Sequence, residues 1–441
     1  MTTRTGYRVW AMVLLLLMAG MLNAQIATKY AFGQSSTVWE PVFGTYATDA
    51  MQDEGLAGPY EIGFNFPYAG TNVTQVKISS NGWVNPSGNL TNPYYNNSSG
   101  LAALNLLPLL APLWDDLSLQ FGAVQFANYG VAPHRVFFVQ WQAAKWNYAG
   151  ENEFNFMVRM HETGQIDFIY GPHTGTSYNA SATLGINLAP GGSGNYYSIL
   201  PGVPALAFTT TQYNNIASIP DNGTMYIFML KSTLNFNAAA LNLRGPKNPM
   251  HSVASEYVIT VGNAGTNPIP ADAAHVYLRR GEEILASAAL PQIMPGSYSE
   301  AVLSWAPDTT GLMYLNARVE LGNDPDSLND VTFSYAITAQ PYVANEDNLA
   351  PAPEVQLSCQ PNPWRESVSF AYRTGKSETA QIEVYNLKGQ KLRTLRSAAR
   401  GDGSLVWDGK SDSGHQVPEG LYLVRLQAGE KAITRKLVRL K

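Results

Sequence analysis

Apolar and polar residues alternate in short stretches along most of the chain. Examples are "YEIGFNFPYAG", "HRVFFVQWQAAKW" and "NEFNFMVRMHETGQIDFIYG", each long enough for one or two strands. A period of two places successive side chains on opposite faces of a strand. Turn signals such as Asn81-Gly82 and "HETGQ" separate these stretches and favour hairpins. The pattern predicts an antiparallel β-sandwich over residues 25–232.

Helical periodicity is not apparent at useful length. The apolar stretch "GLAALNLLPLLAPLWDDL" is interrupted by Pro108 and Pro112, which remove backbone donors and clash with a preceding helical turn. We therefore expect strands and loops here.

Two further groups of short alternating stretches follow. Residues 233–344 contain "EYVITVGNAGTNPIP" and "SYSEAVLSWAP", at the spacing typical of an immunoglobulin-like sandwich. Residues 345–355 mix Asn, acidic residues and Pro without periodicity, which predicts a linker. Residues 356–441 again alternate, as in "AQIEVYNLKGQKLRTL". We predict an all-β protein of three tandem antiparallel β-sandwich domains, with the second and third immunoglobulin-like.

The first 24 residues have the pattern of a secretory signal peptide. Arg4 and Arg8 precede an apolar run from Val9 to Leu22, and "LNA" approximates a cleavage site. An uncleaved anchor helix is the alternative, but the run is shorter than the ~20 residues that span a bilayer. No later stretch is long and apolar enough, so we expect no transmembrane span in the mature chain.

Composition limits the classes of partner and of stabilisation. The single cysteine, Cys359, excludes a disulfide framework in this 441-residue chain. The segment from Gln356 onward has 15 Lys and Arg against 8 Asp and Glu, whereas residues 25–355 have 11 against 25. The basic residues lie along alternating stretches without aromatic interleaving, so we expect no nucleic-acid partner.

The stretch "WDGKSDSGHQVPEG" places Asp408, Asp412 and Glu419 at the first, fifth and twelfth positions of a calcium loop. An EF-hand also needs an oxygen ligand at the third position, glycine at the sixth and flanking helices. Lys410 and Ser413 occupy those two positions, and the flanks alternate as strands do. The stretch is therefore interpreted as an acidic turn.

The last 86 residues carry a resemblance. "PNPW", "IEVYNLKGQKLRTL", "WDGKSDSGHQVPEGLYLVRL" and "ITRKLVRLK", in this order and spacing, resemble the C-terminal sorting domain of type IX secretion substrates, in its variant similar to the immunoglobulin-like domain of the flagellar hook-capping protein. The resemblance implies a β-sandwich read by an outer-membrane translocon of Gram-negative bacteria. It also implies removal of the domain on release, or attachment to surface lipopolysaccharide.

The resemblance assigns family positions to several residues. Pro361, Asn362 and Pro363 would open the domain, Gly389 would lie in a β-turn, and residues 436–441 would form a basic final strand. One departure is Cys359-Gln360, where an aromatic residue is more usual. The positions assigned to the sorting domain are Pro361, Asn362, Pro363, Gly389, Trp407, Asp408, Gly409, Gly414, Gly420, Tyr422, Lys436, Arg439 and Lys441.

Two weaker resemblances cover the rest. Residues 55–230, with "IGFNFPYAGTNVTQVKISSNGWV" and "LAPLWDDL", are similar to the nidogen-type extracellular β-domain of bacterial surface proteins. Residues 233–342, with "VELGNDPDSLNDVTFSYAI", are similar to the bacterial cell-adhesion-related domain. Both resemblances imply adhesion or display rather than chemistry.

Catalytic motifs are not evident. "HETGQ" lacks the second histidine of HExxH, and "GGSGN" does not fit G-x-S-x-G. We therefore expect a protein that is not an enzyme and has no cofactor. The alternative is a lectin or glycan-active enzyme in which Trp83, Trp114, Asp115 and Asp116 form a ligand surface.

A loop in the second domain is a weak calcium candidate. Asp324, Asp326, Asn329 and Asp330 in "GNDPDSLND" supply hard oxygen ligands. An Asx-rich turn explains the same residues and is favoured.

These observations lead to one main hypothesis on function, and a self-assembling structural component of an envelope layer is a further alternative. We expect an exported bacterial protein, secreted or held at the outer surface, that the type IX translocon delivers and that binds an extracellular ligand or partner.

Overall fold

The computed structural model describes residues 25–102, 108–119, 122–146, 153–174, 180–188, 192–342, 355–374, 379–400, 403–429 and 431–441. The predicted signal peptide lies outside these residues, as does nearly all of the predicted linker. The chain divides into two compact units, Met1–Tyr342 and Val343–Lys441.

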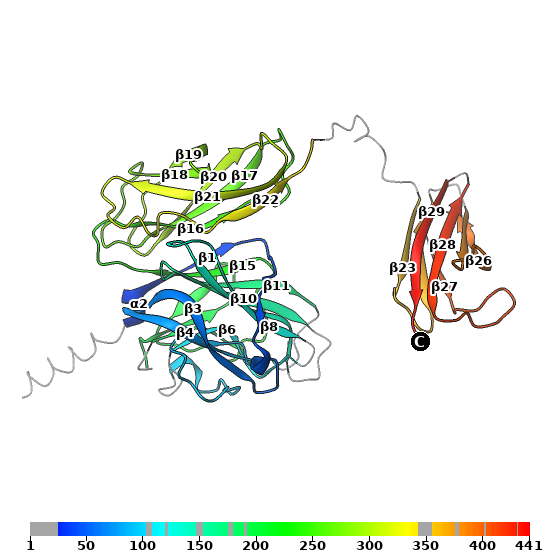
Figure 1. Cartoon of the computed structure of the whole chain (residues 1–441), viewed down its shortest axis with the longest axis horizontal. Helices are drawn as coiled ribbons and strands as arrows, with labels where there is room; N and C mark the ends of the chain where they lie inside the picture. Colours follow the sequence, from blue (N-terminus) through cyan, green and yellow to red (C-terminus); the bar gives the residue numbers. More distant parts are fainter. Residues whose placement is uncertain are drawn as a thin grey trace, which may run out of the picture. The chain divides into compact units, whose positions relative to one another are not determined.

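The first domain is a sandwich of two antiparallel sheets (Figure 1). Within the described residues one sheet has, in spatial order, β1 (Tyr30–Ser36), β15 (Thr224–Leu230), β11 (Ile166–His173), β10 (Phe154–His161), β9 (Val136–Trp146), β8 (Ala123–Tyr129) and β2 (Thr45–Tyr46), with β7 (Leu117–Ser118) beside β9. The facing sheet has β14 (Leu206–Phe208), β13 (Tyr196–Leu200), β12 (Thr183–Asn187), β6 (Leu109–Trp114), β5 (Val84–Asn85), β4 (Thr71–Ser79) and β3 (Leu56–Tyr68). Short helices are α2 (Gln25–Lys29), η1 (Thr48–Ala50) and η2 (Gly100–Ala102).

Both predicted hairpins of this domain are present. Strands β4 and β5 pair across the Asn81-Gly82 turn, with Ile78 opposite Val84. Strands β10 and β11 pair across "HETGQ", where Gly164 has a φ of 88° that favours glycine. The rings of residues such as Trp141 and Phe156 stack between the sheets at a centroid distance of 4.9 Å.

The second domain is a smaller sandwich, as predicted. One sheet has β16 (Ala238–Arg244), β17 (Ser255–Asn263) and β20 (Tyr298–Trp305). The other has β19 (Glu283–Ala289), β18 (Ala274–Arg280), β21 (Gly311–Leu321) and β22 (Tyr335–Ala339). Its core is aliphatic, with Val276, Leu278 and Leu315 fully buried.

The third domain is also a sandwich of three and four strands within the residues described. The first sheet has β23 (Gln356–Gln360), β24 (Val368–Arg373) and β27 (Gly403–Trp407). The second has β26 (Lys391–Arg400), β25 (Thr379–Tyr385), β28 (Gly420–Ala428) and β29 (Lys431–Arg439). Trp364 and Trp407 pack in its core with ring centroids 5.1 Å apart. Cys359 carries a free thiol, and burial raises its pKa to about 11.

The first two domains share an apolar interface, which sequence analysis did not predict. Met229 on β15 and Leu241 on β16 belong to one buried cluster that joins the outer face of the large sheet to the second domain. The Tyr298 hydroxyl donates to the Ala31 carbonyl at 2.6 Å, and Asn242 donates to the Ser36 carbonyl at 3.0 Å. In Figure 1, β16 lies beside β1 and β15. This packing explains why the two domains form a single compact unit.

Among the described residues, no helix has the length and apolar character needed to cross a membrane.

Candidate functional site

The structure corrects the ligand surface predicted in the first domain. The side chains of Trp83 and Trp114 are both 0% exposed, and both indole nitrogens donate to the Tyr94 carbonyl, at 3.2 and 2.9 Å. A ring that stacks on a sugar needs an accessible face. These two tryptophans are therefore core residues and do not form a ligand platform.

Asp115 is equally committed to the fold. One carboxylate oxygen accepts from the Trp146 indole and the Ser181 amide, each at 2.7 Å. The other accepts from the Asp116 amide at 2.9 Å and the Ser181 hydroxyl at 3.0 Å. Four hydrogen bonds satisfy a buried carboxylate and hold strand β6 against the neighbouring loop. Of the four residues predicted for the ligand surface, only Asp116 reaches solvent.

Asp116 belongs to a carboxylate cluster that sequence analysis missed. Oxygen atoms of Asp53, Glu54 and Asp116 all lie within 4.8 Å of one another. Burial raises the pKa of both Glu54 and Asp116, and mutual repulsion among these acids adds to that effect. Glu54 and Asp116 are 62 positions apart in the sequence, and only the fold brings the segments that follow η1 and β6 together.

In the calcium candidate loop of the second domain, the carboxylates of Asp324 and Asp326 accept hydrogen bonds from backbone and side-chain amides. The Asp324 carboxylate accepts from the amides of Ala238 at 2.6 Å and of Asp326 at 2.9 Å. Asp326 accepts from the Asn237 side chain at 3.0 Å and the Leu328 amide at 3.2 Å. These are the contacts of an Asx-rich turn that fixes the loop against β16.

Two residues of this loop are incompletely satisfied. Asn329 donates to the Asn237 side-chain oxygen at 2.8 Å, but its own side-chain oxygen is buried without a partner among the described residues. Burial raises the pKa of Asp330 to about 7, and the charge of Asp324 adds to the effect. The carboxylates of Asp324, Asp326 and Asp330 do not converge within 4.8 Å as the first-domain cluster does. Calcium binding here stays a prediction.

The acidic stretch of the third domain is a turn between strands, as interpreted from the sequence. Asp408 accepts from the Lys410 amide at 3.1 Å, and the Lys410 ammonium lies 3.8 Å from its other oxygen. The Trp407 indole donates to the Lys410 carbonyl at 2.7 Å. Gly409, with a φ of 73°, and Gly414, with 83°, supply left-handed backbone at the bends.

The "PNPW" segment holds the final strand. The Asn362 side-chain nitrogen donates to the Lys436 carbonyl, and its oxygen accepts from the Val438 amide, both at 2.9 Å. The Trp364 amide then donates to the Val438 carbonyl at 2.9 Å, and the Leu440 amide donates to the Trp364 carbonyl at 2.8 Å. A segment 74 residues earlier thus satisfies one end of the open edge of β29.

The basic residues of this strand divide into buried-facing and solvent-facing groups. The Arg439 guanidinium lies over the Trp364 ring, 5.0 Å from the ring centroid, and donates to the Val417 carbonyl. Lys436 and Lys441 are exposed. The remaining sorting-domain positions shape the scaffold: Pro361 and Pro363 flank Asn362, Gly389 lies in the Asn386–Gln390 turn, Gly420 begins β28, and the Tyr422 hydroxyl donates to the Pro418 carbonyl.

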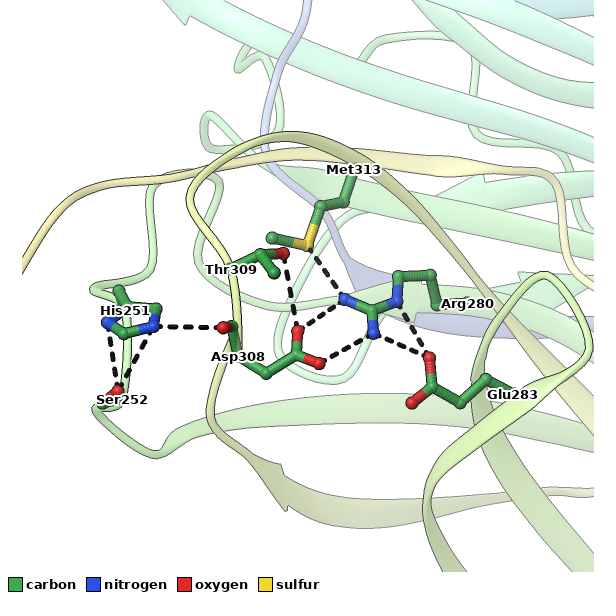
Figure 2. Close-up of polar contacts among 7 residues, drawn as sticks. All are labelled: His251, Ser252, Arg280, Glu283, Asp308, Thr309 and Met313. Atoms are coloured by element: carbon green, nitrogen blue, oxygen red, sulfur yellow. Dashed lines mark hydrogen bonds and ion pairs between the residues drawn. The ribbon is translucent and has the colours of Figure 1, made fainter.

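Another polar group contains the residue types of a hydrolase triad (Figure 2). The Ser252 hydroxyl lies 3.0 Å from His251 Nδ1, and His251 Nε2 lies 3.1 Å from the backbone oxygen of Asp308. The Asp308 carboxylate faces away from the histidine and binds Arg280 through two hydrogen bonds of 2.6 and 2.9 Å. A triad needs that carboxylate on the histidine. This group instead ties two loops of the second domain together.

Comparison with family models assigns each domain separately. Residues 29–230 match the model described as NIDO related, residues 241–331 match CARDB, and residues 365–432 match the FlgD Ig-like domain. These matches confirm the NIDO-related and CARDB resemblances and the similarity of the third domain to the FlgD Ig-like domain, while its role as a sorting domain stays a prediction. No single model covers half of the chain. A comparison with curated proteins gave no significant match.

Several solved structures match parts of this chain. The CARDB domain of PF1109 from Pyrococcus furiosus is 18% identical over 24% of this chain and 97% of that domain, with a TM-score of 0.21. Dimeric latent PorU from Porphyromonas gingivalis is 11% identical over 69% of this chain and 31% of that chain, at a TM-score of 0.19. PorZ, a surface component of the type IX secretion system of that bacterium, is 10% identical over 83% of this chain and 50% of that chain, with a TM-score of 0.17.

Proposed function

We propose that this chain is a non-enzymatic protein exported to the surface or surroundings of a Gram-negative bacterium. Its third domain serves as the label that the type IX secretion translocon reads. The first two domains form the displayed part, which takes part in adhesion or in binding an extracellular partner. Attachment to surface lipopolysaccharide and release into the medium are the two fates open to the delivered protein.

The observation that carries the proposal is the construction of the last strand. Strand β29 lies at the edge of its sheet, and the side chains of Lys436 and of Lys441, just beyond the strand, are exposed. A receptor can recognise such an edge by backbone pairing or by acidic groups facing the basic side chains. The "PNPW" segment fixes the strand from Lys436 onward, so the label is preorganised. Preorganisation reduces the entropy lost on recognition.

Several independent features support this proposal. The third domain is a compact unit of its own, as a transferable label requires. Its match to an FlgD Ig-like domain agrees with the sorting-domain variant that the sequence resembles. The chain also begins with the pattern of an export signal. CARDB and NIDO-related domains suit display, because both resemblances imply surface roles.

Truncation in a bacterium with a working type IX system tests the delivery role. A chain that lacks residues 431–441 should accumulate inside the envelope, whereas the full chain should reach the outer surface or medium without residues 1–24. Because removal of a strand could unfold the domain, a charge-reversed chain with Lys436→Glu and Lys441→Glu serves as a folded variant. Matched reversal of two exposed bases elsewhere, Lys29→Glu and Lys388→Glu, should leave delivery intact.

Normal delivery of both the truncated and the tail-reversed chain would overturn the proposal. A transplant provides the converse test. Residues 355–441 fused behind a signal peptide and a fluorescent reporter should carry the reporter to the surface, and the same fusion without β29 should not.

A further inference from the structure

A cavity of about 510 Å³ lies between the first and second domains. Its walls come from the outer face of strands β9, β10 and β11, from the segment after β1, and from the second domain around β16 and β22. This volume is in the range of small-molecule sites. The walls that matter here are Phe138, Arg159, His161, Asp167, Lys247 and Tyr335.

Arg159 lies at the centre of a row across the sheet. It is opposite Phe138 on β9 and opposite Asp167 on β11. Its guanidinium lies 5.5 Å from the centroid of the Phe138 ring. No hydrogen bond or ion pair joins this guanidinium to any residue that the structure describes, and its Nε is buried without a partner. A guanidinium has five donors, so an unpaired one in a partly buried wall is costly.

The nearest acid does not satisfy Arg159. Asp167 is fully buried, and its two oxygens are taken by His161 Nε2 at 2.6 Å and by the Gln165 side-chain amide at 2.7 Å. Gln165 also donates to the Leu241 carbonyl at 3.0 Å, which anchors this group to the second domain. Asp167 thus offers Arg159 an attractive field across the row but no direct partner.

A second cation faces the same cavity. Lys247 donates to Glu40 at 2.7 Å and to the Ala336 carbonyl at 3.0 Å, and its ammonium lies 3.5 Å from the centroid of the Tyr335 ring. Burial lowers the pKa of Lys247, and the charge of Arg159 lowers it further. The two cations are therefore close enough to repel each other. Glu40 neutralises the charge of Lys247. Arg159, in contrast, has no acidic side chain in direct contact among the described residues.

The rest of the lining is largely apolar and aromatic. Val42, Phe43, Phe138, Leu243 and Phe333 contribute hydrocarbon surface, and Phe43 is 78% exposed. Sites for organic ligands typically combine such walls with a few converging polar groups. Because Arg binds carboxylate and phosphate oxygens through paired hydrogen bonds, an oxyanion is the complement of this arrangement.

We propose that this cavity binds a small organic oxyanion, a carboxylate or a phosphate monoester, with an aromatic or branched aliphatic body. The oxyanion accepts from the Arg159 guanidinium, with Lys247 within electrostatic range. The body of the ligand packs on Phe138, Phe333 and Tyr335. The ligand contacts both domains and strengthens their union. This site is separate from the delivery role of the third domain.

Matched probes test the charge requirement on the full chain. Benzoate and phenyl phosphate are the two anionic probes, benzamide and benzyl alcohol are neutral relatives, and benzylamine is the cation. Calorimetry and thermal unfolding should show binding and stabilisation with one or both anions, and little with the neutral and cationic probes. The two anions separate the carboxylate from the phosphate source. Equal binding of anionic and neutral probes, or binding of none, would overturn the proposal.

Replacement of Arg159 gives two effects of opposite sign. Arg159→Met should lower the affinity for the preferred anion about 10- to 100-fold, as expected for a lost charge-assisted contact. The same change should raise the melting temperature of the free protein, because it removes an unpaired, partly buried cation. A merely structural arginine would lower that temperature when replaced.

The control is Arg425→Gln, an exposed arginine on β28 of the other unit. It should leave both affinity and melting temperature unchanged. Should Arg159→Met fold poorly, Arg159→Lys provides the check, since it keeps the charge and loses the fork. Anion affinity that survives both replacements would refute the assignment of Arg159.

Discussion

The side-chain nitrogen of Asn362 lies 2.9 Å from the backbone oxygen of Lys436, across 74 residues of sequence. The side-chain oxygen of Asn362 accepts from the Val438 amide two residues further on. One asparagine thus takes the place of a neighbouring strand at the edge of the sheet, since it satisfies one carbonyl and one N–H. The resemblance assigned Asn362 to a motif, and the structure gives that motif a physical task.

Removal of this side chain should loosen the final strand before the rest of the domain. Asn362→Ala deletes two hydrogen bonds worth about 0.5–1.5 kcal/mol each, and water replaces part of that because the site is exposed. We expect amide exchange of residues 432–440 to accelerate about tenfold or less, as the opening free energy falls by ~1 kcal/mol. Hydrogen exchange read by mass spectrometry measures this. Gln356→Ala, an exposed change on β23, should leave the exchange as it was.

Two glycines of the third domain distinguish crowding from backbone strain. Gly389 and Gly409 have φ angles of 77° and 73°, so alanine strains the backbone at both. A Cβ on Gly409 would lie 2.6 Å from the Trp364 ring, whereas one on Gly389 would meet nothing within 4 Å. We expect Gly389→Ala to cost ~1 kcal/mol and Gly409→Ala about 2–4 kcal/mol. Urea unfolding measures the two losses in unfolding free energy. Equal losses would show that the Trp364 ring moves aside without cost.

The sandwiches could be predicted because strand periodicity and turn chemistry are local. Asn81-Gly82 and Gly164 lie at the bends where hairpins were expected, and Ile78 pairs with Val84 across the first. The position of aromatic residues relative to the surface is not local in this way. The sequence suggests Trp83 and Trp114 as part of a ligand surface, but both donate to the Tyr94 carbonyl inside the fold.

The sequence does contain a signal for the interface between the first two domains, in a strand that is apolar on both faces. "MYIFML" in β15 is apolar at every position, and Met225 to Met229 are buried throughout. An antiparallel strand with one solvent face should alternate, so an unbroken apolar run indicates that both faces are covered. The partner of the second face, and hence the cavity beside Arg159, depends on docking of two domains and has no sequence pattern of its own.

Asp330 should make the stability of the second domain depend on pH near neutrality. Its folded pKa of about 7 lies above the ordinary value of 3.8, so the folded state binds the proton more tightly. Stability should therefore rise as the pH falls from about 8 towards 4. Asp330→Asn should flatten this rise and stabilise the protein at pH 8 by ~1–2 kcal/mol, after allowance for solvent screening. Thermal unfolding across this range measures it.

The control for this change is Glu256→Gln, an exposed acid on β17 of the same domain. It should keep the slope of the wild type. A calcium titration of the wild-type chain belongs with the same measurement, because an ion held at this loop would lower the pKa of Asp330 and remove the slope. A slope that Asp330→Asn leaves in place would show that another group carries it.

Asp308 should affect the pH dependence of stability in the direction opposite to Asp330, and at lower pH. The Arg280 guanidinium holds the pKa of Asp308 at about 2, below its usual 3.8, through the paired hydrogen bonds drawn in Figure 2. The folded state therefore binds the proton less tightly than the unfolded chain does. The stability from this pair is complete above about pH 4 and disappears as the pH falls towards 2. Asp308→Asn should remove that part of the acid dependence.

Salt provides the discriminating condition, because Asp308 lies at the surface and its attraction to Arg280 is screened. The difference between wild type and Asp308→Asn at pH 5 should shrink between about 0.02 M and about 0.5 M sodium chloride. Glu282→Gln, in the β18–β19 hairpin that contains Arg280, removes a carboxylate that pairs with Arg279 and is 98% exposed, so it should show little effect at either salt concentration. A difference that salt leaves unchanged would mean that the Asp308 side chain acts through the geometry of its hydrogen bonds to Arg280 and not through its charge.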